Sequence, residues 1–558
     1  MLTVMSTNGT KKQLEDWSHI QWQKANKLVR NLRQRIFRAR KLGNFKTLRS
    51  LQKLMQRSYA NLLLSVRRIT QTNKGKATAG IDKEIINTPA QRVTLVNTWS
   101  GGNLQPTRRV EIPKPNGKKR PLGIPTVRDR IEQAIIKNSL EPEWESLFEP
   151  NSYGFRPGRS CHDAIEQNFL RVQFRRDTWV LEADIKGFFD NIAHESILSM
   201  ISNFPNRGLI KEWLKAGYIF KGKLNPTDMG TPQGGVISPL LANIGLHGLE
   251  EHIKSIRPKY AKARRDKFGV VRYADDFIVT ARDKESLEKV QIQIQQWMSE
   301  RGLELSAEKT LITSMDEGFD FLGFNHRHYN GKLLIKPSKR KVLDFCKRLG
   351  KEIKALNGAK QEDVIRKLNP ILRGFANYYK SVVSKETFSY ISYRVWQYLW
   401  RWAKRRHPNK NTTWIRKAYF KTINGNKWRF ACNISEHRGM VDRIYSLYPI
   451  AYTPIERHVK VKGEASPDDP SLKEYWDKRN QKLGKSYYAK GSKKYLIAQN
   501  QKWRCPICGE PLLNGEEIET HHIVPVSEGG LDDISNLQHL HTPCHKQVHS
   551  KSKSTSLK

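Results

Sequence analysis

The chain has 558 residues, enough for several domains, and 38% of them are hydrophobic, so a globular core is expected rather than disorder. Lysine and arginine number 99 against 54 acidic residues, which gives a net charge of +45. Such an excess repels itself in a compact chain unless a polyanion neutralises it, and a phosphate backbone is the natural partner. No apolar run approaches the roughly 18 residues that span a bilayer, so we expect no membrane partner.

The first residues lack the charged-then-apolar order of a signal peptide, so we expect a cytoplasmic protein, with nucleoid association or an organelle left open. Six cysteines in so long a chain do not indicate a disulfide scaffold. Three of them, Cys505, Cys508 and Cys544, cluster near the C-terminus, which indicates a metal site.

The N-terminal region is basic and helical. Residues 17–81 contain 16 lysines and arginines and no acid, and Leu and Ile recur at three- and four-residue steps over 24–69. A solvated basic helix face would explain some of these bases. The length of the acid-free window favours nucleic-acid contact instead, with Arg30, Arg33 and Arg38 as candidates.

Residues 70–330 mix strand-like runs with helical ones, an α+β layout. The run VVRYADDFIVT (270–280) predicts a hairpin with Asp275 and Asp276 at its tip, and a plain turn would also place aspartates there. The strand-like run VLEAD supplies a further carboxylate, Asp184. Three carboxylates can hold two Mg²⁺ ions about 3.5–4 Å apart, the arrangement that supports phosphoryl transfer.

The remaining chain changes character twice. Residues 331–440 are helical, basic and aromatic, and residues 460–495 are polar and rich in Gly, Ser and Lys, typical of a linker or a loosely ordered module. Residues 505–549 carry seven acids and one base, which marks a separate domain. There, C-x-x-C at Cys505 and Cys508 and H-x-x-C at His541 and Cys544 form two ligand pairs suited to a structural Zn²⁺.

Several blocks, in order, resemble the reverse transcriptases encoded by group II introns. They are NKGKATAGID (73–82), RRVEIPKPNGKKRPLGIPTVRDRIEQ (108–133), SYGFRPGRSCHDAI, ADIKGFFD, GTPQGGVISPLLANI (230–244), YADD, GLELSAEKT (302–310) and FDFLGF (319–324). The resemblance implies a multidomain α+β protein: a right-hand-type polymerase with fingers and palm, a helical thumb or maturase domain, and a small zinc-containing ββα-metal domain.

The resemblance also implies residue roles in the polymerase. Asp184, Asp275 and Asp276 match the carboxylates that bind Mg²⁺. Four residues match nucleotide-binding positions: Lys114 and Arg120 for the triphosphate, Phe189 for the sugar and Gln233 near the templating pair. Lys309 is a weaker candidate for a primer or phosphate contact, with a solvated lysine as the alternative, and Asp190 is interpreted as structural.

The last segment is similar to the HNH endonucleases. His522 matches the general base, His521 and His545 match ligands of a catalytic Mg²⁺ or Mn²⁺, and Asn536 matches the residue that braces the loop. His549 follows His545 by four residues and is a candidate third ligand. In the family the second zinc pair is usually C-x-x-C, whereas here His541 replaces the first cysteine. A zinc knuckle without catalysis is the alternative.

We therefore expect five segments: a basic helical extension (1–70), fingers and palm (71–330), a thumb or maturase domain (331–440), a DNA-binding region or linker (441–495) and an HNH domain (496–558). The resemblance implies an RNA-directed DNA polymerase that uses dNTPs, binds its intron RNA to assist splicing, and nicks double-stranded target DNA to prime reverse transcription. Two alternatives are an RNA-binding splicing factor with a vestigial polymerase and a domesticated reverse transcriptase without an intron. The complete YADD and fingers argue against the first, and the maturase-like and HNH segments argue against the second.

Overall fold

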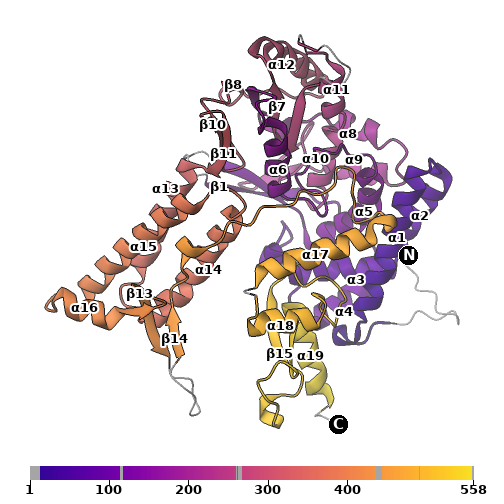
Figure 1. Ribbon diagram of the computed structural model, residues 1–558. Coiled ribbons are helices and arrows are strands. Elements are labelled where there is room, and N and C mark those ends of the chain that lie inside the picture. The colour runs from indigo at the N-terminus through magenta and orange to yellow at the C-terminus, as the bar shows by residue number, and fades with distance from the viewer. Residues whose placement is uncertain are drawn as a thin grey trace.

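The computed structural model describes residues 13–113, 117, 119–258, 260–261, 267–434, 443–488 and 490–555. The predicted triphosphate contact Lys114 lies outside the described residues. Figure 1 shows the chain as a broad body with a helical arm on one side, and the C-terminal segment returns to lie below the N-terminal helices.

The N-terminal layer consists of α-helices, as the sequence predicts for residues 24–69. Its helices are α1 (Trp22–Lys41), α2 (Phe45–Arg57), α3 (Tyr59–Arg67) and α4 (Pro89–Asn97). The first three pack on α5 (Val127–Glu145), and side chains such as Phe37, Met55 and Ile131 are almost fully buried between them. The apolar side chains thus form the inward stripe, and exposed bases such as Arg38 lie on the other faces.

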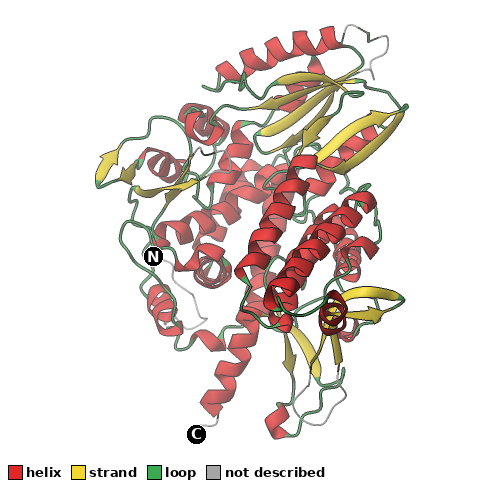
Figure 2. Cartoon of the chain, turned by 90° about the vertical axis from the view of Figure 1, so that its left-hand side faces the viewer, coloured by secondary structure: helices red, strands yellow, loops and turns green. Residues whose placement is uncertain are grey.

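A four-stranded antiparallel sheet forms the palm and lies at the top of the molecule in Figures 1 and 2. Its strand order is β6-β7-β3-β8. The strands are β3 (Trp179–Asp184), β6 (Gly269–Tyr273), β7 (Asp276–Ala281) and β8 (Leu311–Ser314). Helix α12 (Lys284–Ser299) packs on β3, β7 and β8, and α6 (Cys161–Val172) packs on the edge strand β6.

A second four-stranded sheet, of order β2-β1-β4-β5, forms the fingers. Its strands are β1 (Thr107–Pro113), β2 (Lys119–Ile124), β4 (Tyr218–Phe220) and β5 (Lys223–Asn225). Short helices complete fingers and palm: α7 (Phe188–Asn191), α8 (His194–Met200), α9 (Arg207–Lys215), α10 (Ser238–Gly245) and α11 (Leu249–Ser255).

The arm in Figure 1 begins after a three-stranded sheet, β9 (Phe319–Phe321), β10 (Phe324–Tyr329) and β11 (Lys332–Pro337). Its helices are α13 (Lys339–Ala355), α14 (Gln361–Tyr379), α15 (Lys385–Arg406) and α16 (Thr412–Tyr419). Strands β12 (Phe420–Ile423), β13 (Asn426–Ile434) and β14 (Arg443–Ser446) follow. Leu399 and Trp402 are each 1% exposed, so one face of α15 is core.

The segment after β14 differs from the loosely ordered linker expected for residues 460–495. It crosses the palm, where the fully buried Asp163 of α6 accepts hydrogen bonds from His458 (2.9 Å) and Arg479 (2.8 Å). Helix α17 (Lys473–Tyr487) then places Trp476 against Gly158, where no side chain would fit. Paired charges and a buried tryptophan hold this segment, and a count of polar residues does not reveal either.

The C-terminal domain has the expected ββα shape. Its elements are α18 (Lys493–Asn500), β15 (Ile518–His522), β16 (Leu537–His541) and α19 (Thr542–Thr555), with β15 and β16 antiparallel. The multidomain α+β fold class is thereby confirmed. Among the described residues, no helix combines the length and the apolar character that crossing a bilayer requires.

Candidate active sites and metal centre

The three predicted polymerase carboxylates meet at one edge of the palm sheet. Asp184 is the last residue of β3 and Asp276 the first of β7, and the two are direct cross-strand partners. Asp275 occupies the turn that joins β6 to β7. The antiparallel register therefore brings together two carboxylates that lie 92 residues apart in the chain.

The turn that carries Asp275 has a strained backbone, and buried neighbouring residues hold it in place. Ala274 has φ of 60°, a conformation that favours glycine, and it is buried. Buried Arg272 donates to the Ala274 carbonyl (3.2 Å) and to Asn243 (3.1 Å). Gly154 passes so closely that a Cβ there would lie 2.3 Å from the Ala274 nitrogen. This surrounding structure fixes the turn and hence the position of Asp275.

Negative charge is in excess at this edge. Desolvation, together with repulsion from Asp184, raises the pKa of Asp275. Desolvation and the carboxylates of Asp275 and Asp184 raise the pKa of Asp276 to about 7. The Lys309 ammonium donates to Asp184 at 2.6 Å, so this lysine lies beside the carboxylates. Hard carboxylate oxygens that repel one another fit a divalent cation such as Mg²⁺.

Three of the predicted nucleotide-binding residues, Arg120, Phe189 and Gln233, lie among the described residues. Arg120 of β2 donates to Gln233 (3.0 Å), and the Gln233 amide reaches Asp190 at 3.4 Å. Phe189 is 8% exposed and packs edge-on against Phe155, with ring centroids 6.2 Å apart. The contact between Asp190 and Gln233 was not predicted, because no spacing in the sequence relates residues 43 positions apart.

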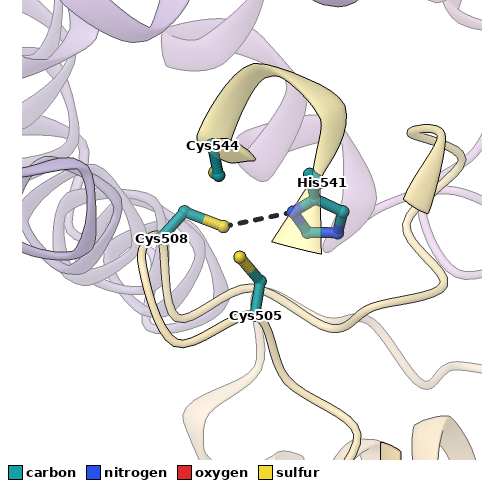
Figure 3. Close-up of side chains that lie close together, drawn as sticks. All are labelled: Cys505, Cys508, His541 and Cys544. Atoms are coloured by element: carbon teal, nitrogen blue, oxygen red, sulfur yellow. Dashed lines mark hydrogen bonds between the residues drawn. The ribbon is translucent and has the colours of Figure 1, made fainter. Parts of the chain in front are cut away.

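Four buried side chains form a compact group in the C-terminal domain (Figure 3). The sulfurs of Cys505, Cys508 and Cys544 and a ring nitrogen of His541 all lie within 4.8 Å of one another. His541 Nε2 lies 3.2 Å from the carbonyl oxygens of Pro511 and Leu512, which can only accept, so Nε2 carries the proton. Nδ1, 3.3 Å from the Cys508 sulfur, is then free to bind a metal. Three thiolates and one oriented imidazole are compatible with zinc.

A second group contains three histidines. His521 of β15 and His545 and His549 of α19 bring one ring nitrogen each within 4.8 Å of the others. Desolvation and the two neighbouring rings lower the pKa of His521 and so favour the neutral form that a metal needs. The sequence did not identify Glu519, whose carboxylate contacts His545 Nδ1. The available signal was its two-residue spacing from His521 on a strand, which places both on one face.

The predicted base His522 adjoins this group on β15, and its Nε2 lies 3.2 Å from Asp532. Asn536 closes the intervening loop, because its side chain donates to the carbonyls of Val524 (3.0 Å) and Leu531 (2.8 Å) and accepts from the Val524 amide (2.8 Å). Among the described residues, the only groups with three or more such close ligand atoms are the cysteine–histidine group and the histidine group. The palm carboxylates are more widely spaced.

Four family models match the chain in succession. They are the N-terminal domain of reverse transcriptase (17–99), reverse transcriptase (RNA-dependent DNA polymerase) (112–326), the group II intron maturase-specific domain (343–420) and HNH endonuclease (505–551). The order and extent of these matches, on the fold described above, define a reverse transcriptase with a maturase domain and an HNH nuclease.

Among known proteins, the group II intron-encoded protein LtrA of Lactococcus lactis subsp. cremoris is 30% identical over 417 residues, spanning 58% of this chain and 69% of LtrA. Protein YkfC of Escherichia coli (strain K12) is 35% identical over 301 residues, 47% of this chain and 79% of YkfC. The chain belongs to the group II intron-encoded proteins, and it is an RNA-directed DNA polymerase and DNA endonuclease.

Solved structures give a more distant likeness. Apo telomerase from Candida tropicalis, truncated from the C-terminal domain, has a TM-score of 0.32 and 13% identity, covering 42% of this chain and 55% of that one. A likeness this weak does not bear on the assignment.

Proposed function

We propose that Asp184, Asp275 and Asp276 are the catalytic carboxylates of DNA synthesis and hold two Mg²⁺ ions. When bound, these ions stabilise the attacking 3′-hydroxyl and the leaving pyrophosphate oxygens. The observation that carries this role is the direct pairing of Asp184 with Asp276 across β3 and β7. Lys309 then neutralises charge beside Asp184 and reaches a primer phosphate.

The adjoining surface receives the incoming dNTP. The guanidinium of Arg120, with Lys114, binds the triphosphate, which suits a forked donor and a flexible cation. The ring of Phe189 sits under the sugar and excludes a 2′-hydroxyl. Gln233, fixed by Arg120 and Asp190, lies near the templating pair.

The C-terminal domain nicks double-stranded target DNA. Cys505, Cys508, His541 and Cys544 hold a structural Zn²⁺, because soft thiolates retain it. His521, His545 and His549 hold Mg²⁺ or Mn²⁺ beside the scissile phosphate. His522 takes a proton from the attacking water, and Asn536 keeps the loop closed around it.

The arm binds the intron RNA. Tyr393, Trp396 and Trp400 of α15 stack in sequence, with ring centroids 6.2 and 6.1 Å apart, and Trp428 of β13 meets Trp396 and Trp400 edge-on. Tyr393 is 56% exposed and Trp428 44%, so these rings offer faces to unpaired bases, and Arg416 and Lys404 lie beside them. Within the cell, the complex of this protein with its intron RNA inserts the RNA into one DNA strand and nicks the other strand. The polymerase then extends the new 3′-hydroxyl.

Primer extension on an RNA template tests the polymerase proposal. Asp275→Ala should reduce extension at least roughly 100-fold, because charge stabilisation at the reacting centre is lost, while RNA binding persists. Asp316→Ala is the matched control, since its carboxylate is exposed and pairs with Arg175 away from the site. Extension by the Asp275→Ala protein at a tenth or more of the wild-type rate would contradict the proposal.

A further inference from the structure

The nuclease domain shares a core with the N-terminal helices of the polymerase. The cysteine–histidine group sits at this junction, and Figure 3 shows N-terminal helices beside Cys508. One buried apolar cluster contains residues from both parts: Trp17, Trp22, Leu62, Val66 and Ile69 from the first and Trp503, Cys505, Cys508, Leu512, Leu540 and Cys544 from the second. The two parts are about 480 residues apart in the chain, yet they pack as one unit.

Polar contacts surround this shared core. The Asn26 amide of α1 donates to the Cys508 carbonyl at 3.0 Å. Gln547 of α19 donates to the Ser18 carbonyl at 2.6 Å. Arg30 of α1 pairs with Glu510 of the loop that carries the first cysteine pair. The loop and the helix that supply the cysteines are therefore each tied to the N-terminal layer.

Arg67 of α3 crosses this interface and meets a cysteine sulfur. Its Nη2 lies 3.1 Å from the sulfur of Cys544 and 3.5 Å from a carboxylate oxygen of Glu516. Its guanidinium carbon lies 4.7 Å from the centroid of a Trp22 ring. The residue is 5% exposed, so a buried cation from the polymerase depends on partners that the nuclease domain supplies.

We propose that Arg67 is the outer partner of the zinc thiolates, and that metal binding and docking of the nuclease domain on the polymerase form one linked equilibrium. The proposal rests on the zinc site proposed above. Three thiolates carry one negative charge more than Zn²⁺ neutralises, and Arg67, which also pairs with Glu516, brings a positive charge within hydrogen-bond distance of one of them. Without zinc the sulfur of Cys544 is no longer held in place, so the 3.1 Å contact that Arg67 makes with it is no longer fixed.

The linkage acts in both directions. Docking places the Arg67 cation beside Cys544 and so strengthens zinc binding, and zinc binding fixes the sulfur that Arg67 needs. The zinc site thereby does more than fold its own small domain. It also holds the nuclease domain against the N-terminal helices of the polymerase.

The test compares full-length Arg67→Met with Arg68→Met. Met keeps the length of the side chain and removes the charge, and Arg68 is the exposed residue that directly follows α3. Zinc content is measured by elemental analysis, and zinc loss as the rate of transfer to a chromogenic chelator. Arg67→Met should release zinc roughly 10- to 100-fold faster than wild type, as for other outer-shell partners, and Arg68→Met should match wild type. The rate of zinc release from Arg67→Lys should lie between the rates of Arg67→Met and Arg68→Met.

Hydrogen exchange of the wild-type protein provides the reciprocal measurement and does not depend on how well a variant folds. Stripping zinc should raise exchange in α1 and α3, which lie in the other part of the chain, and restoring zinc should reverse it. Wild-type protein without bound zinc would overturn both the zinc site and the linkage. Zinc that is bound, but whose release leaves exchange in α1 and α3 unchanged, would overturn the linkage alone, as would equal release rates from Arg67→Met and Arg68→Met.

Discussion

Among single residues, Asp276 shows the conflict between activity and stability most directly. It stands opposite Asp184 and next to Asp275, and this crowding raises its pKa to about 7. Asp276→Asn should therefore lower primer extension roughly 100-fold, through loss of a metal-binding charge. The same change should raise the Tm of the metal-free protein by roughly 1–2 °C, since one of three repelling charges is removed in a partly solvated site.

The pH dependence of the rise in Tm expected for Asp276→Asn gives an independent check. The folded-state pKa of Asp276 lies above its usual value of 3.8, so the folded protein retains a proton that the unfolded chain releases. The Asp276 carboxyl thus costs stability as pH rises from about 4 to about 7. The Tm difference between Asp276→Asn and wild type should be near zero below pH 4 and reach its full size above pH 7. Calorimetry without divalent ions measures it, and a constant difference across pH would contradict the crowding argument.

Variants at His522 and Asp532 should distinguish the general base of the nuclease from the residue that positions it. His522→Ala removes the group that activates water, so nicking of duplex DNA should stop while zinc content and RNA-templated extension of a supplied primer persist. Asp532→Asn should slow nicking about tenfold, because the 3.2 Å contact that orients the His522 ring is weakened. Glu528→Gln, exposed on the same domain, serves as control. Nicking by His522→Ala at the wild-type rate would exclude it as the base.

At the scale of elements, the sequence predicted those helices, strands and ligand pairs that depend on residues close together in the chain. The strands around YADD, the helices of residues 24–69 and both ligand pairs of the cysteine–histidine group follow from short-range patterns. Other features depend on contacts over hundreds of residues. The hydrogen bond from Arg479 to Asp163 and that from Arg67 to Cys544 join segments 316 and 477 residues apart. No local spacing encodes such pairs, so a tightly packed segment was interpreted as a linker.

The attachment of α17 to α6 can be tested at Asp163. Arg479 and His458 both donate to this buried carboxylate and help to lower its pKa to about 2. Asp163→Asn should cost about 3–5 kcal/mol and expose residues 453–488 to trypsin, because a buried cation loses its partner. Glu456→Gln, in the same segment, removes a carboxylate that is 45% exposed and should leave cleavage unchanged. In wild type this stabilisation should hold above about pH 4 and fade as pH falls toward 2.

The aromatic face of α15 gives a second prediction for an element. Tyr393→Ala and Trp428→Ala should each weaken binding of single-stranded RNA by about 1–3 kcal/mol, because each ring offers a stacking face. Thermal stability should change little, since both side chains are half exposed. Trp402→Ala is the contrasting variant, because its buried ring supports the core and its loss should lower Tm. If Tyr393→Ala and Trp428→Ala both bind RNA with unchanged affinity, this face of α15 is not part of the RNA-binding surface.

For the whole molecule, the net charge is +45, and the basic residues behind it fall into two groups. Some form ion pairs that stabilise the fold, and others remain available to bind RNA. Arg33, which the sequence suggested as an RNA contact, is only 14% exposed and pairs with Glu141 (2.9 Å) and Asp468 (2.7 Å). Arg30 likewise pairs with Glu510, whereas Arg38 on the same helix is exposed. Composition counts these arginines alike, but only contacts made across the fold distinguish them.

Charge reversal separates the two groups. Arg38→Glu should weaken intron RNA binding, lower the slope of log K against log salt by about 1 and leave Tm unchanged, because it removes one phosphate contact. Arg33→Glu should instead lower stability by about 3–5 kcal/mol, since it places a third acid beside Glu141 and Asp468. RNA binding as a function of salt and thermal unfolding, measured on both proteins, distinguish these effects. A salt slope that Arg38→Glu leaves unchanged would show that RNA binds to a different face of the protein and that α1 serves only to hold its domains together.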